Sequence, residues 1–271
     1  MADALLTSGG AEPRRRTVSV MDLPLVFLAP RRLFARVEDV CAYRFTGLFL
    51  LVCVTLIGWA TVETGLVDRQ ADLLVRKQIA DLEEEQRDVV ERSELKRLIE
   101  ERRKAGEFLK LMARIQTIGL APVVTLASVL LICAALFGVV ALSGKKPEWH
   151  TLLTVCTYSW FVDVLGRLVW LGLVLRHATL DVDLSLGALM RIVPPMASDP
   201  SGTQTAAIYA VLSALDPFHV WFWLLMGLGL HTTSQLRGWR LWVICVLLWL
   251  IGAGMRGAGA AAQSLAAATT G

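Results

Sequence analysis

The sequence contains no asparagine, which excludes N-linked glycosylation because the acceptor motif begins with that residue. Charged residues make up only 19% of the 271 residues, whereas hydrophobic residues make up 55% and the mean hydropathy is +0.56. A soluble domain has about a quarter of its residues charged. The net charge of +3 is too small to indicate a nucleic-acid partner. The composition therefore predicts an integral membrane protein that is surrounded by the lipid bilayer.

Motifs for metal binding and catalysis are also missing. The sequence has no C-x-x-C pair, no zinc-type spacing of Cys and His, and no H-E-x-x-H, P-loop, nucleophile elbow or G-x-G-x-x-G. We interpret the isolated cysteines as small apolar packing residues; they are Cys41, Cys53, Cys133, Cys156 and Cys245. The sequence predicts no enzymatic activity, no metal and no cofactor.

Five apolar runs approach the length of about 20 residues that a helix needs to cross the hydrocarbon core. They cover residues 45–62, 118–142, 152–175, a run that starts at 216, and 241–254. Tryptophans gather near the ends of these runs, as in interfacial aromatic belts. The fold class that follows is all-α, a polytopic membrane protein with five transmembrane helices and a long charged helical insert outside the bilayer.

The remaining segments complete the predicted domain organisation. It comprises a disordered tail (1–20), an amphipathic interfacial helix (21–44), the first span (45–66), a charged helical arm (67–114), a membrane domain with spans two to five (115–255), and a flexible C-terminal tail (256–271). Within the membrane domain, the apolar piece 203–215 is too short to cross alone. It is either an interfacial helix or the first half of a fourth span kinked at Pro217.

The charged arm holds 12 acidic and 12 basic residues, with acid-first pairs at helical spacing such as Glu100 and Lys104. Glycine and proline are absent between Gly65 and Gly106, so we expect a helix. The chain must return to the membrane near residue 118. The arm therefore either lies along the surface or forms a hairpin that turns near Ser93. Its function is open between a solvated loop and a docking element for a partner.

Asp163 and Arg167 are the ionisable residues near the middle of an apolar run, and their spacing places them on one helix face. A charge in hydrocarbon is costly, so each is expected to be paired and to face protein or water. The pair is either a self-neutralised contact between helices or part of an ion or proton path. Ala253 and Gly257 form a small-xxx-small pair that is a candidate for helix packing.

Orientation follows from the basic residues. Without the charged arm, 11 Lys and Arg lie on the N-terminal side of the predicted spans and 3 on the other side. This distribution predicts a cytoplasmic N-terminus and an external C-terminus. Counting the arm reverses the bias to 11 against 15, because its 12 basic residues fall on the external side. An excess of Arg (21) over Lys (6) is typical of a GC-rich bacterial genome.

Several of these features resemble the Yip domain family of Ypt/Rab-interacting membrane proteins, in particular its bacterial branch. The resemblance rests on the proline- and arginine-bearing segment 24–32, the charged insert after the first span, and above all the fourth run. That run contains Asp216, Pro217, Phe218, Trp221, Gly227 and Gly229, which match the family's pattern. The DLYGP segment of eukaryotic members is absent, so their Rab and vesicle-coat interactions are not implied.

The resemblance implies a five-span, non-enzymatic protein that acts through other membrane proteins. Some bacterial members resemble accessory or assembly factors for transport complexes. The predicted function is therefore a scaffold, accessory or assembly factor for a partner membrane complex, which includes a transporter complex, or a role in membrane organisation. The alternative is a small transporter or channel subunit that uses Asp163 and Arg167. A homo-oligomer is compatible with both, and the predicted location is the bacterial cytoplasmic membrane.

Overall fold

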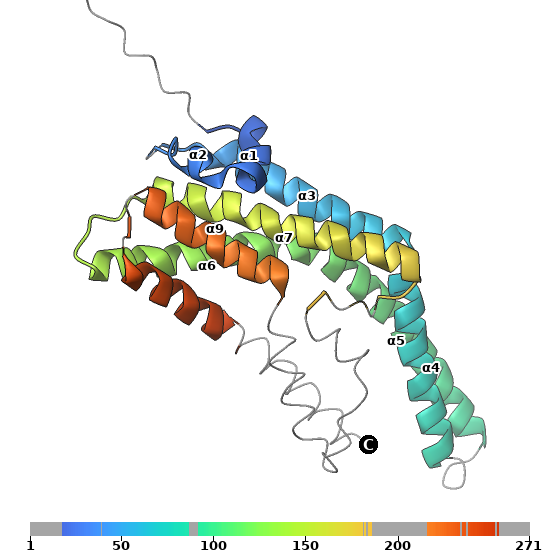
Figure 1. The fold of residues 1–271 in the computed structure, drawn as a ribbon. Helices are drawn as coiled ribbons and strands as arrows, with labels where there is room; N and C mark the ends of the chain where they lie inside the picture. Colours follow the sequence, from blue (N-terminus) through green and yellow to red (C-terminus); the bar gives the residue numbers. More distant parts are fainter. Residues whose placement is uncertain are drawn as a thin grey trace, which may run out of the picture.

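The computed structural model is helical throughout the part of the chain that it describes. These residues are 18–38, 40–86, 92–180, 182, 184–185, 216–233, 235–236, 238–252 and 254. No strand occurs among them, which confirms the all-α class for these residues (Figure 1). The piece 203–215, the C-terminal tail and the pair Ala253 and Gly257 lie outside the described residues.

Four helices lie side by side in a bundle: α3 (Tyr43–Glu63), α6 (Ala121–Leu142), α7 (Trp149–His177) and α9 (Pro217–Thr232) (Figure 1). Helix α7 packs against the other three. Every side chain from 151 to 159 is buried, including three threonines and a serine. A helix that is buried on all sides occupies the centre of a bundle, so α7 is the central element.

Three helices are long and apolar enough to cross a membrane: Tyr43–Glu63, Ser93–Leu142 and Trp149–His177. Large apolar side chains cover their outer faces; Phe45 is 79% exposed and Leu131 is 69% exposed. Helix α9 has 16 residues, and the C-terminal helix Trp239–Gly252 is also shorter than the roughly 20 residues of a full span. Length and composition thus support three of the five predicted spans, and the other two stay a prediction.

The N-terminal segment differs from the single interfacial helix that the sequence predicted. It forms a turn of 3₁₀-helix η1 (Val20–Asp22) and two short helices, α1 (Leu23–Leu28) and α2 (Pro30–Phe34). Proline disfavours a helical conformation in the residue before it, and Ala29 is the break. Val26, Leu33 and Phe34 are buried in the bundle core rather than turned to lipid. An ion pair of 2.6 Å between Arg36 and Asp22 closes the segment.

The charged arm is an antiparallel hairpin of α4 (Leu66–Gln86) and α5 (Arg92–Ile115) that projects from one end of the bundle (Figure 1). This decides between the two arrangements that the sequence left open. Ser93 lies in the first turn of α5, so the connection precedes it, in residues 87–91 outside the described part. The predicted pair of Glu100 and Lys104 is present, with a separation of 3.6 Å.

Ion pairs join the two helices at the base of the arm. Arg114 Nε donates to Asp68 Oδ1 at 2.9 Å, and Lys110 Nζ lies 2.6 Å from Asp72 Oδ1. Hydrogen bonding by the Arg114 guanidinium lowers the pKa of the Asp68 carboxyl below its ordinary value. Each pair joins one residue of α4 to one of α5, so together they fix the register of the hairpin where it leaves the bundle.

A turn of π-helix, η2 (Gln116–Leu120), joins α5 to α6 and packs against α3. At this contact the Cα of Gly58 approaches the backbone carbonyl of Thr117 so closely that a Cβ would overlap the oxygen. Near the other end of α3, Thr46 Oγ1 donates to Tyr158 Oη at 3.1 Å, and both side chains are fully buried. A close backbone approach and a buried hydrogen bond thus hold α3 in place.

We predict that Gly58→Ala destabilises the protein by about 1–3 kcal/mol, because the new methyl group meets backbone atoms that cannot rotate away. The measurement is the midpoint of thermal unfolding of the purified protein in mild detergent. Gly47→Ala on the same helix is the control, since its Cβ would lie 3.9 Å from the nearest atom, Thr157 Cγ2. Equal midpoints for the two variants would contradict the close contact.

Candidate functional site

The site begins with an ion pair on the central helix. Arg167 Nε donates to Asp163 Oδ2 at 2.7 Å, and the two residues stand four apart on one face of α7. Their side chains are 39% and 42% exposed, respectively. The pair is therefore neutralised within its own helix and opens on a hollow rather than on the packed core.

The first turn of α9 supplies the second part of the site. Asp216 is the N-cap of this helix: its Oδ1 accepts a hydrogen bond from the Phe218 amide at 2.8 Å, and Pro217 is the first helical residue. The Phe218 ring lies against α7 at Gly166, where a Cβ would come within 3.0 Å of Phe218 Cγ. The glycine thus lets the start of α9 approach the ion pair.

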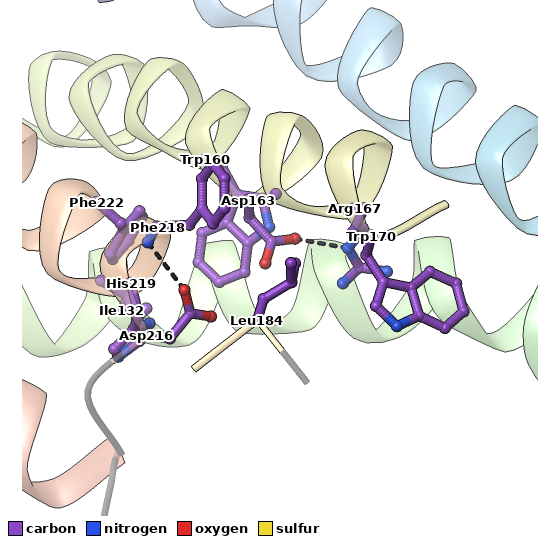
Figure 2. A pocket seen from close by; sticks show the side chains of 11 residues that line it. Ile132, Trp160, Asp163, Arg167, Trp170, Leu184, Asp216, Phe218, His219 and Phe222 are labelled. Atoms are coloured by element: carbon purple, nitrogen blue, oxygen red, sulfur yellow. Dashed lines mark hydrogen bonds and ion pairs between the residues drawn. The ribbon is translucent and has the colours of Figure 1, made fainter. Parts of the chain in front are cut away.

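Together these groups line one cavity of about 370 Å³, which we call the cleft. Figure 2 shows Asp163 between Arg167 on one side and Asp216 on the other. The side chains that carry its chemistry are Trp160, Asp163, Arg167, Trp170, Asp216, Phe218 and His219. His219 Nε2 accepts a hydrogen bond from Trp223 Nε1 at 3.1 Å, so that nitrogen carries no proton. The cleft combines two carboxylates, one guanidinium and several aromatic rings.

The ion pair lies at the middle of α7, as its place in the apolar run predicts. Arg167 and Trp170 also line a second hollow, together with Thr61 near the end of α3 and Ala121 at the start of α6. Val54 and Ile57, from the second half of α3, line the same hollow, which therefore extends from the ion pair toward the arm.

The family model described as "Yip1 domain" matches residues 25–256, which is most of the chain. The chain belongs to the Yip1 domain family. Proteins of this family are non-enzymatic membrane trafficking proteins, so this chain is an integral membrane protein and the cleft is not an active site. No curated protein and no solved structure matches the chain.

The other residues of α9 that we predicted to belong to the family pattern lie on packing faces of this helix. The Trp221 ring meets Phe27 of α1 edge-on, with centroids 5.5 Å apart. Gly227 faces the Trp242 ring of the C-terminal helix, and Gly229 faces Val155 of α7. The structure therefore brings Asp163, Arg167, Asp216 and Phe218 together, whereas these three residues join α9 to its neighbours.

Sequence reasoning did not single out several residues that line the cleft in this Yip1 domain, among them Trp160, Gly166 and Trp170. A signal for the two tryptophans was available, because residues 160, 163, 167 and 170 recur at intervals of three and four and so share one helix face. Gly166 carried no such signal. Its importance depends on Phe218, which is distant in sequence. Among the described residues, no group of His, Cys, Asp and Glu could hold a metal.

We predict that Asp216→Ala lowers the stability of the Yip1 domain by about 1 kcal/mol, because the Phe218 amide loses its cap. Asp216→Asn is the matched control, since asparagine caps helices as well as aspartate does. Thermal unfolding in detergent measures both. A loss of equal size in the asparagine variant would show that the negative charge, rather than the cap, stabilises this turn.

Proposed function

We propose that this Yip1-domain protein is a scaffold, accessory or assembly factor for a partner membrane complex, and that the arm of α4 and α5 is its docking element. The observation that carries the proposal is the construction of the arm. Ion pairs between Asp68 and Arg114 and between Asp72 and Lys110 fix its base, and the rest projects away from the bundle (Figure 1). A rigid arm of this kind presents a surface that the bundle does not need for its own packing.

The surface of the arm suits a protein partner. Side chains of both signs stand free of the bundle; those of Arg97 and Glu100 are 82% and 72% exposed. Nearer the base, large apolar side chains are also uncovered, with Leu73 65% exposed and Phe108 58% exposed. Apolar contacts supply affinity in an interface, whereas charges mainly select the partner. The arm offers both.

The proposal places the protein in a bacterial cytoplasmic membrane with its N-terminus inside and its C-terminus outside. The distribution of Lys and Arg outside the arm, 11 against 3, supports this orientation. It requires five crossings, so α9 and the C-terminal helix Trp239–Gly252 each cross the bilayer. The arm, which follows the first span, then lies on the external side, where it meets external parts of a membrane complex.

We predict that replacing residues 77–104 by a short Gly-Ser linker abolishes the co-purification of a stoichiometric membrane partner. The replacement deletes the projecting part of the arm but keeps both ion pairs at its base. The measurement is affinity purification from the native membrane after crosslinking, quantified by mass spectrometry against the unaltered protein. Unchanged thermal unfolding establishes that the bundle is intact. Undiminished recovery of the partner would exclude the arm as the docking element.

A matched variant separates charge from shape in this experiment. Exchanging Glu100 and Lys104, as Glu100→Lys with Lys104→Glu, keeps the helix, the net charge and the ion pair, but reverses the pattern of charge on the surface. We expect this variant to retain the fold of the arm. A partner that contacts the charged side chains of this face should bind the exchanged variant less tightly than it binds the unaltered protein.

One observation favours the second candidate function, a small transporter or channel subunit. Charged groups from two helices, Asp163 and Arg167 on α7 and Asp216 on α9, line the same cleft. A path for ions or protons needs such convergence, which the sequence did not reveal.

Our proposal of a scaffold predicts that proteoliposomes with the purified protein show no proton flux above that of protein-free vesicles. The measurement uses an entrapped pH-sensitive dye and an imposed pH gradient. Asp163→Ala with Arg167→Leu should then change stability alone. Proton flux that the unaltered protein supports and this double variant abolishes would replace the scaffold by the second candidate.

A further inference from the structure

Two cavities meet at Arg167 and Trp170. One is the cleft, and the other, which we call the groove, has a volume of about 740 Å³ and runs from the bundle to the base of the arm. Both volumes fall within the range of about 300–1,000 Å³ that is typical of ligand sites. Because the same two side chains line both cavities, a single ligand can occupy them together.

The cleft has unused hydrogen-bonding capacity of both kinds. Among the described residues, the ion pair with Asp163 uses only Nε of the Arg167 guanidinium. Its other N–H groups are donors and suit a phosphate. In contrast, Asp216 uses one carboxylate oxygen to cap α9, and its second oxygen is an acceptor that suits an ammonium group.

The charge of the cleft favours a zwitterion over an anion. Asp163 and Arg167 neutralise each other, which leaves the carboxylate of Asp216 as the net charge. Aromatic rings, among them Trp160 and Phe218, stand beside this carboxylate and attract cations with their faces (Figure 2). A ligand with one phosphate and one amine matches these groups better than a ligand with a phosphate alone.

The groove is suited to an apolar chain. Val54 and Ile57 of α3 line it on the side of the bundle. On the side of the arm it is lined by Leu74, Leu109 and Met112, which are 58%, 46% and 38% exposed. Such exposed apolar side chains gain free energy when a hydrocarbon chain covers them.

We propose that the cleft and the groove together bind one phospholipid with a zwitterionic, amine-bearing headgroup of the phosphatidylethanolamine type. Arg167 binds the phosphate, Asp216 binds the ammonium group, and one acyl chain lies in the groove. The lipid bridges α7, α9 and the base of the arm. This inference goes beyond the proposed function and does not depend on a protein partner.

The test is native mass spectrometry of the purified full-length protein in mild detergent. The probes are dioleoylphosphatidylethanolamine, dioleoylphosphatidylglycerol and soluble phosphoethanolamine. Arg167→Gln removes the phosphate contact and Ala113→Trp fills the groove. Their matched controls are Arg176→Gln and Ala105→Trp, because these exposed residues lie on the same helices but line neither cavity. Asp216→Asn keeps the cap but removes the charge.

We expect one molecule of phosphatidylethanolamine per protein, bound about tenfold more tightly than phosphatidylglycerol. Arg167→Gln and Ala113→Trp should each weaken its binding about tenfold, whereas the controls leave it unchanged. Asp216→Asn should narrow the difference between the two lipids. If the Arg167→Gln variant unfolds, two other measurements test the inference. They are the lipid preference of the unaltered protein and the comparison of Ala113→Trp with Ala105→Trp.

Three results would overturn the inference. Phosphatidylglycerol that binds as tightly as phosphatidylethanolamine, or more tightly, would exclude the assignment of the amine. Soluble phosphoethanolamine that binds as tightly as the lipid would exclude the groove. Equal lipid binding by Ala113→Trp and Ala105→Trp would show that the acyl chain lies elsewhere. None of these results bears on whether the arm docks a protein.

Discussion

The complete burial of the first half of α7 is the constraint on which the rest of the structure depends. Residues 151–159 contact protein on every side, so α3, α6 and α9 must each present a matching face to this helix. Most buried hydroxyls of this stretch bond within the helix or to α3, whereas that of Ser159 has no partner among the described residues. Thr154 and Thr157 donate to carbonyls one turn earlier, and Tyr158 accepts from Thr46 of α3. The centre of the bundle is thus apolar, and its hydrogen bonds specify how the helices pack.

The second half of α7 has a different environment, and this asymmetry produces the site. Helix α9 begins beside Gly166 and packs along the first half of α7. Neighbouring helices therefore cover the first half of α7 more fully than the second half. An ion pair is tolerable where cover by neighbouring helices is incomplete and the two charges neutralise each other. The cleft, the groove and the base of the arm consequently meet around Arg167.

Local patterns predicted much of this architecture. The three long apolar helices follow directly from run length, because a spanning segment must satisfy its own backbone groups. Asp216 before Pro217 predicted the start of α9, since a cap and a first-turn proline act within a few residues. Segment 21–44 was less predictable, because its apolar face can contact lipid and protein equally well. Only the burial of Phe34 in the bundle core shows that this face contacts protein.

The sequence by itself determined the class of the protein, the helical segments, the ion pair on α7 and the family pattern of α9, because each depends on composition or on neighbours a few residues apart. Only the tertiary structure decided that the arm is a hairpin, that Gly58 and Gly166 are contact points, and that Asp216 joins Asp163 and Arg167 in one cleft. These features depend on contacts between segments far apart in the chain, and no local pattern encodes such distances.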